Sequence, residues 1–129
     1  MTLTPKATEL QALLKRVEAA RGPNRELFLA IAESVVPDYR QEMEWRAAFN
    51  SFIGVGAWTD AALALAERVL PEANHLGVEK DLAGWNAYVS RNAIESGHWL
   101  FEAWGKKTPA LALVAATLRA MIATQGEKT

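Results

Sequence analysis

Apolar side chains recur three and four positions apart in the first third of the chain, which predicts two amphipathic helices, Pro5–Ala20 and Asn24–Val35. Thr4 and Asn24 are residue types that cap helix starts, and the pair Gly22-Pro23 separates the two segments. Because the link is short, we expect an antiparallel hairpin of helices. The positions expected to be buried are Leu10, Leu13, Leu14, Val17, Leu27, Phe28, Ile31 and Val35.

Residues 38–56 carry two conflicting patterns. Met43, Trp45 and Ala47 alternate with charged residues, which is the period of a strand. Most residue types in this segment nevertheless favour a helix, and Tyr39, Met43 and Ala47 also lie four positions apart. The segment is therefore open between a short helix, a strand and irregular chain.

Two more helices are rich in alanine and leucine. One spans Ala61–Leu70, after the capping pair Thr59-Asp60, and ends at Pro71. The other begins at Thr108-Pro109, and we expect its polar tail to fray from about residue 124. Its apolar stripe consists of Leu111, Val114, Ala115, Leu118, Met121 and Ile122.

Between residues 75 and 104 the hydrophobic period changes from 3.6 to 2, which predicts the three strands His75–Glu79, Trp85–Arg91 and His98–Trp104. Turn residues between them indicate an antiparallel meander. Alternation gives this sheet two faces. The apolar face carries Leu76, Val78, Trp85, Ala87, Val89, Trp99, Phe101 and Ala103. The mixed face carries His75, Glu79, Asn86, Tyr88, Ser90, His98, Leu100, Glu102 and Trp104.

The element order predicts an α+β fold in which a three-stranded antiparallel meander is sandwiched between about four to five helices, in one domain over residues 1–129. Two pairs of apolar helices for one small sheet favour helices on both faces. In that arrangement Pro5–Ala20 and Asn24–Val35 cover the mixed face.

The segments Trp58-Thr59-Asp60-Ala61-Ala62-Leu63-Ala64-Leu65 and Lys107-Thr108-Pro109-Ala110-Leu111-Ala112-Leu113 occur together with an opening segment Ala20-Arg21-Gly22-Pro23-Asn24-Arg25-Glu26-Leu27. With this element order, the chain resembles small phage and prophage proteins that have an α-β-α sandwich domain. The resemblance covers most of the chain except residues 38–52. It implies a fold and a phage-related origin, and it supplies no activity or catalytic residue.

Composition excludes several classes of function. Fourteen basic against 15 acidic residues give a net charge of −1, which favours neither nucleic acid nor an anionic membrane surface as a partner. The absence of cysteine removes disulfides, thiolate metal sites and cysteine nucleophiles. No basic stretch leads into an apolar run near residue 1, and no apolar run reaches the roughly 20 residues of a membrane span. We therefore expect a cytoplasmic protein.

Candidate chemistry is sparse. His75, Glu79, His98 and Glu102 share the mixed face, but residues four apart on a strand are about 13 Å apart, so neither pair within a strand can hold one ion. The Gly54-Val55-Gly56 turn lacks the motif of a phosphate loop. No serine has the context of a nucleophile. The sequence predicts no catalytic residue, no metal site and no cofactor.

The aromatic residues are unusual, because five tryptophans occur in 129 residues. Tyr88, Leu100 and Trp104 lie on the mixed face with His98, and such residues are favoured at binding interfaces. If that face is incompletely covered, these four residues are the candidate partner-binding residues.

We therefore expect a non-enzymatic phage-derived protein that binds another protein, from the host or the phage, with a second copy of itself as a further candidate partner. Inhibition of a host system and a virion accessory role are both open. The alternative is a small metal- or ligand-binding domain or enzyme that uses His75, His98 and Glu102.

Overall fold

The computed structural model describes residues 5–73, 75–93 and 97–127, and this part of the chain forms five helices and one sheet. The helices are α1 (Pro5–Ala19), α2 (Arg25–Val35), α3 (Met43–Gly54), α4 (Trp58–Val69) and α5 (Pro109–Glu127), with a 3-10 turn η1 (Tyr39–Gln41) before α3. The strands β1 (His75–Asp81), β2 (Gly84–Ala93) and β3 (Gly97–Lys106) form an antiparallel sheet in the order β1-β2-β3. The predicted α+β class and three-stranded meander are confirmed.

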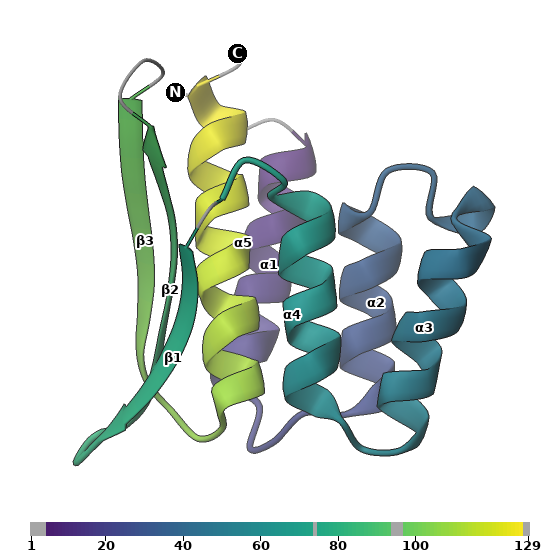
Figure 1. The fold of residues 1–129 in the computed structure, drawn as a ribbon, viewed down its shortest axis with the longest axis horizontal. Coiled ribbons are helices and arrows are strands. Elements are labelled where there is room, and N and C mark those ends of the chain that lie inside the picture. The colour runs from purple at the N-terminus through teal and green to yellow at the C-terminus, as the bar shows by residue number, and fades with distance from the viewer. Residues whose placement is uncertain (1–4, 74, 94–96, 128–129) are drawn as a thin grey trace.

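The helices gather on one side of the sheet (Figure 1). Helix α5 lies against all three strands, α1 and α4 pack on α5, and α2 and α3 lie farther from the sheet. The first two helices were expected over the mixed face, but they lie instead on the same side as α5. We call the face toward α5 the inner face and the opposite one the outer face.

The apolar surface of each helix explains this arrangement. Every residue of α5 from Ala110 to Leu118 is buried, so this helix can contact the sheet on one side and other helices on its remaining sides. By contrast, α1 and α2 each bury a single stripe, which includes Leu10 and Val17 in α1 and Phe28 and Ile31 in α2. A helix with one stripe covers one partner. Their stripes are used within the helical layers, and neither helix has a second apolar face for the sheet.

Residues 38–56 form η1 followed by α3, so the helix-forming propensity of this segment prevailed over its alternating pattern. The buried side of α3 follows Phe49 and Ile53, and the rings of Trp45 and Phe49 stack with centroids 4.7 Å apart. Met43 is 69% exposed, and Ala47 is exposed as well. Of the residues four apart that suggested a helix, Met43 and Ala47 therefore do not pack, whereas Tyr39, which lies in η1, packs against the core.

Two of the predicted helix starts are confirmed by hydrogen bonds. The Asn24 Oδ1 accepts from the Leu27 N–H at 2.8 Å, and the Thr108 Oγ1 accepts from the Leu111 N–H at 3.1 Å. The prediction that Thr59-Asp60 caps the next helix is wrong, because α4 already begins at Trp58. The Trp58 ring packs edge-on against Phe28, 5.2 Å away. At the other end of the chain, α5 continues to Glu127, past the position where its tail was expected to fray.

Candidate interaction surface

The division of the strands into an apolar and a mixed face is confirmed for the inner face. Ala87, Val89 and Ala103 are buried there, and Trp85 and Phe101 pack against the same core. The outer face has no helix over it among the described elements (Figure 1). Its side chains are therefore the ones that a partner can reach.

Three large side chains gather on this uncovered face, and we call them the outer-face patch: Tyr88, Leu100 and Trp104 are 38%, 56% and 56% exposed. Tyr88 lies directly opposite Glu102, so it is the diagonal neighbour of both Leu100 and Trp104 on β3. Diagonal neighbours on one face are within reach of aromatic side chains. At these exposures the patch presents on the order of 300 Å² of mainly apolar surface.

His98, the fourth predicted partner-binding residue, pairs with Asn92 in the backbone ladder of β3 and β2. Its side chain lies outside the described residues. The structure therefore brings together three of the four predicted residues.

The position of the Tyr88 ring depends on Gly77, its cross-strand partner on β1. A Cβ atom at Gly77 would lie 2.5 Å from the Cε1, Cζ and Oη atoms of Tyr88, so the ring covers this glycine. An aromatic ring over a strand glycine replaces the packing that the glycine lacks. The ring therefore leans toward β1 and away from Leu100 and Trp104, which leaves Glu102 between them.

A chain of hydrogen bonds supports the outer face from the β1–β2 turn to the end of β3. Asp81 Oδ1 accepts from the N–H groups of Ala83 and Gly84, at 2.8 and 3.2 Å, and its Oδ2 accepts from Asn86 Nδ2 at 2.7 Å. The Asn86 Oδ1 in turn accepts from the Gly105 N–H at 2.8 Å. The bond from Asn86, with those from the two backbone N–H groups, lowers the pKa of Asp81 because each stabilises its charged form.

Gly105 lies at an irregularity in the ladder between β2 and β3, and its φ of 67° is a conformation that favours glycine. Trp85 pairs with Lys106 and Ala87 pairs with Ala103, so Trp104 and Gly105 together oppose the single residue Asn86. This is the geometry of a β-bulge. Strict alternation would place Lys106 on the outer face with Trp104, but the extra residue turns it to the inner face.

The outer face is acidic. Alternation and the pairing register place Glu79, Asp81 and Glu102 on it, and none of its described side chains belongs to lysine or arginine. Nearby cations point elsewhere: Lys80 lies over the inner-face ring of Trp85, and Lys106 forms an ion pair with Glu18 of α1. A cationic group of a partner is therefore complementary to this face.

The proposed ligand-binding set is not brought together. Across the three strands, His75 is paired with Ser90 and then Leu100, whereas Glu102 is paired with Tyr88 and then Gly77. His75 and Glu102 therefore lie at different heights on opposite edge strands. Two strand spacings separate those edges by about 10 Å. Within the described residues no three histidine or acidic side chains are grouped closely enough to hold a metal ion.

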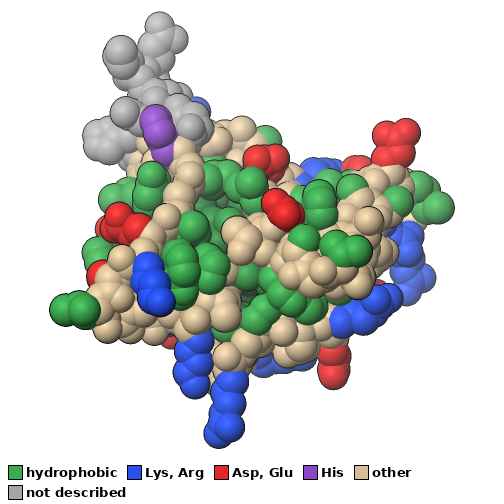
Figure 2. Space-filling model, turned by 60° about the horizontal axis from the view of Figure 1, so that its bottom comes forward, with side chains coloured by type: hydrophobic (Ala, Val, Ile, Leu, Met, Phe, Trp, Pro, Cys, Tyr) green, Lys and Arg blue, Asp and Glu red, His purple; other side chains and the backbone are tan. Residues whose placement is uncertain are grey.

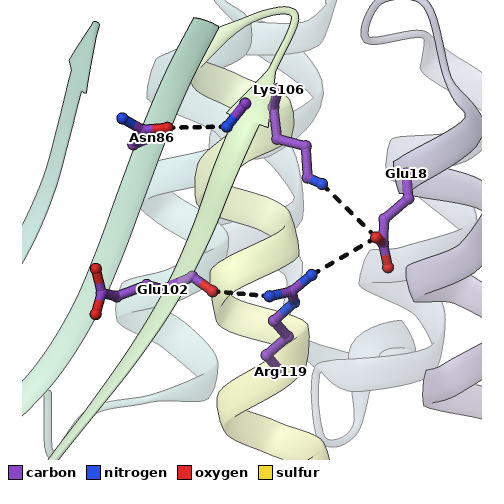
Figure 3. Close-up of polar contacts among 6 residues, drawn as sticks. Glu18, Asn86, Glu102, Lys106 and Arg119 are labelled. Atoms are coloured by element: carbon purple, nitrogen blue, oxygen red, sulfur yellow. Dashed lines mark hydrogen bonds and ion pairs between the residues drawn. The ribbon is translucent and has the colours of Figure 1, made fainter. Parts of the chain in front are cut away.

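Sequence reasoning missed a second feature, a cavity of about 440 Å³ between α1, α5 and β3. Leu14, Phe101 and Ile122 line it, and Glu18 forms ion pairs of 3.6 Å with both Lys106 and Arg119 at its border (Figure 3). The Arg119 guanidinium also donates to the Glu102 carbonyl at 3.1 Å (Figure 3). These cations are used to join β3 to the helices. The sequence does not indicate that Lys106 and Arg119 share Glu18 as a partner, because Lys106 faces the helices only as a result of the bulge.

No family model matches the chain, and neither a curated protein nor a solved structure matches it. The resemblance to phage and prophage proteins therefore stays a prediction. None of the described helices has the length and apolarity to cross a membrane.

Proposed function

We propose that this chain is a non-enzymatic protein-binding module and that it binds its partner through the outer face of the sheet. The observation that carries the proposal is the outer-face patch, in which Tyr88, Leu100 and Trp104 are exposed around Glu102 on a face that no described helix covers (Figure 1). Single exposed apolar residues are ordinary on a protein surface, but several large apolar side chains grouped on one uncovered face favour an interaction site. Tyrosine and tryptophan are also the residues that most often dominate binding energy.

The partner that fits this face combines an apolar group with lysine or arginine. Glu102 lies between the patch residues, and Glu79 and Asp81 extend the acidic character along β1. An interface of ordinary size covers about 800 Å² on each side, which is more than the patch provides, so these carboxylates fall within its expected area. The same charges disfavour a phosphate backbone or an anionic membrane as the partner.

The test is capture from a bacterial lysate with the immobilised chain, followed by titration of the purified captured protein. Trp104→Ala and Leu100→Ala should each weaken binding at least about tenfold, since each removes a large share of the exposed apolar area of the patch. Val55→Ala is the matched control, because Val55 is 78% exposed at the end of α3, away from the sheet. Wild-type affinity in the patch variants, or failure to capture any protein, would contradict the proposal.

The charge of the partner is tested separately. Glu102→Gln should weaken binding and reduce its dependence on salt, because a carboxylate that attracts a cation is screened by added ions. Unchanged salt dependence would contradict a basic partner while leaving the apolar patch in place.

A phage-related origin, with action on a host system or in the virion, is part of this proposal and rests on the sequence resemblance alone. The alternative, a ligand-binding domain or enzyme that uses His75, His98 and Glu102, gains no support from the register, which separates His75 from Glu102.

A further inference from the structure

The two edges of the sheet differ in their protection. Along β3, Arg119 donates to the Glu102 carbonyl, and Lys106 reaches across to Glu18 of α1. Along β1, charged residues occupy the second half of the strand, Glu79-Lys80-Asp81, while the first half around Leu76-Gly77-Val78 carries no charge. Within the described part of the chain, the ladder of β1 is formed with β2 alone. Unprotected strand edges pair readily with other strands.

An apolar hollow lies beside this half of β1. It has a volume of about 160 Å³ and is lined by Leu76, Gly77 and Val78 of the strand, Thr59 and Leu63 of α4, and Leu113 of α5. Val78 and Leu63 are both exposed large hydrophobic residues. Figure 2, which brings the lower end of the molecule forward, shows hydrophobic side chains gathered in a hollow beside the sheet. A fourth strand added to β1 would therefore place apolar side chains over this hollow.

The sequence of β1 is complementary to itself. When two copies are placed antiparallel about a twofold axis through Gly77, Leu76 of one copy lies opposite Val78 of the other, and His75 lies opposite Glu79. Residues opposite each other share a face, so the apolar pair lies on the inner side and the imidazole–carboxylate pair on the outer side. Moving the axis to Val78 would place Lys80 against Leu76, which loses the apolar match.

We propose that β1 is a self-association edge, at which a second copy of this chain adds antiparallel about Gly77 to form a continuous six-stranded sheet. The pairing buries Leu76 and Val78 of each copy against the other and covers the hollow beside Leu63. The contact is an isologous twofold interface, the commonest kind in homo-oligomers. Because it involves one short strand and one helix face from each copy, the dimer is weak and depends on concentration.

This dimer also concerns the partner-binding surface proposed above, although it uses different residues. A twofold axis perpendicular to the sheet leaves both outer faces on the same side and all helices on the other. Each Tyr88 ring leans over its own Gly77, toward the axis, so the two Tyr88 rings approach one another while Leu100 and Trp104 remain on β3, the strand farthest from the axis in each copy. A dimer would thus offer a bivalent surface, and two linked sites bind more tightly than one.

Sedimentation over a wide concentration range and cysteine cross-linking together test the inference. The chain contains no cysteine, so His75→Cys combined with Glu79→Cys introduces the only thiols. In the proposed register these thiols face each other across the axis within disulfide range, whereas each single variant leaves its two thiols about 14 Å apart. We expect a covalent dimer from the double variant and from an equal mixture of the two single variants, but not from either single variant alone.

Leu63→Lys tests the interface without altering the strand and should weaken dimerisation at least about tenfold, while Met43→Lys, 69% exposed at the start of α3, should not. Trp104→Ala should leave dimerisation unchanged, which separates this inference from the proposed function. A monomer up to millimolar concentration would overturn the inference, as would single cysteine variants that cross-link as readily as the double variant. The inference would also be overturned if the chain remained monomeric but an unrelated extended peptide paired with β1.

Discussion

Asn86→Ala is the sharpest test of how the outer face is held together. Asn86 is only 5% exposed although it lies on the outer face, and its amide joins Asp81 in the β1–β2 turn to Gly105 in the bulge of β3. Truncation removes both hydrogen bonds. At about 1 kcal/mol for each net hydrogen bond, we expect the free energy of unfolding to fall by about 2 kcal/mol. Gly105 is exposed, so water replaces part of its lost partner and keeps the cost from rising much further.

The variant is assayed by urea unfolding followed by circular dichroism, with the pKa of Asp81 measured by NMR titration. Because the bond from Asn86 is the largest cause of the lowered pKa of Asp81, that pKa should rise in the variant. Asn50→Ala is the matched control, since the Oδ1 of Asn50 is buried with no hydrogen-bond partner among the described residues. A loss below about 0.5 kcal/mol in Asn86→Ala, with an unchanged pKa of Asp81, would refute the reasoning.

Three further substitutions, at Asp81, Asn50 and Gly77, have expected outcomes of their own. Since the folded state lowers the pKa of Asp81, the stability that this group contributes is full above about pH 4 and is lost as the pH falls through the folded value. Acid titration should therefore show the stability difference between wild type and Asp81→Asn shrinking below pH 4, and a difference that persists there would contradict the assignment. Asn50→Ala should raise the free energy of unfolding by about 0.5 kcal/mol, measured by urea unfolding, because it removes an unsatisfied acceptor and improves helix propensity in α3; a clear loss would mean that the amide has a partner. Gly77→Ala should displace the Tyr88 ring yet change stability by less than about 1 kcal/mol, since the ring can swing aside and alanine costs less conformational entropy than glycine. Its readout is weaker partner binding with a nearly unchanged melting temperature.

The strands were readable from the sequence because alternation is a local signal. Each inner position of β2, such as Ala87 and Val89, is separated from the next by one polar or outward residue, and the pattern needs no knowledge of distant contacts. The same is true of the caps at Asn24 and Thr108, where a side chain bonds to an N–H three residues later. The three residues of the outer-face patch were predicted on the same basis.

For residues 38–56 the local sequence pattern was not sufficient to predict the secondary structure. Both patterns in this segment were present, and the helix that its residue types favour is also the arrangement in which Phe49 and Ile53 are buried, which the local pattern did not show. The bulge at Gly105 is a similar case. A glycine in a strand can mark a bulge, but only the pairing with Asn86 shows that one residue of β2 faces two of β3 and that Lys106 turns inward.

The order of elements, the two faces of the sheet and the main helix starts were thus determined by the sequence alone, since each depends on residues within one or two turns of each other. Which face of the sheet stays open was decided by the tertiary structure. That outcome depends on competition among apolar surfaces from distant parts of the chain, in which α5, apolar on all sides, occupies the inner face and the single stripes of α1 and α2 are buried within the helical layers. A periodic pattern shows that a surface is apolar, but which surface covers it depends on every other apolar surface of the molecule.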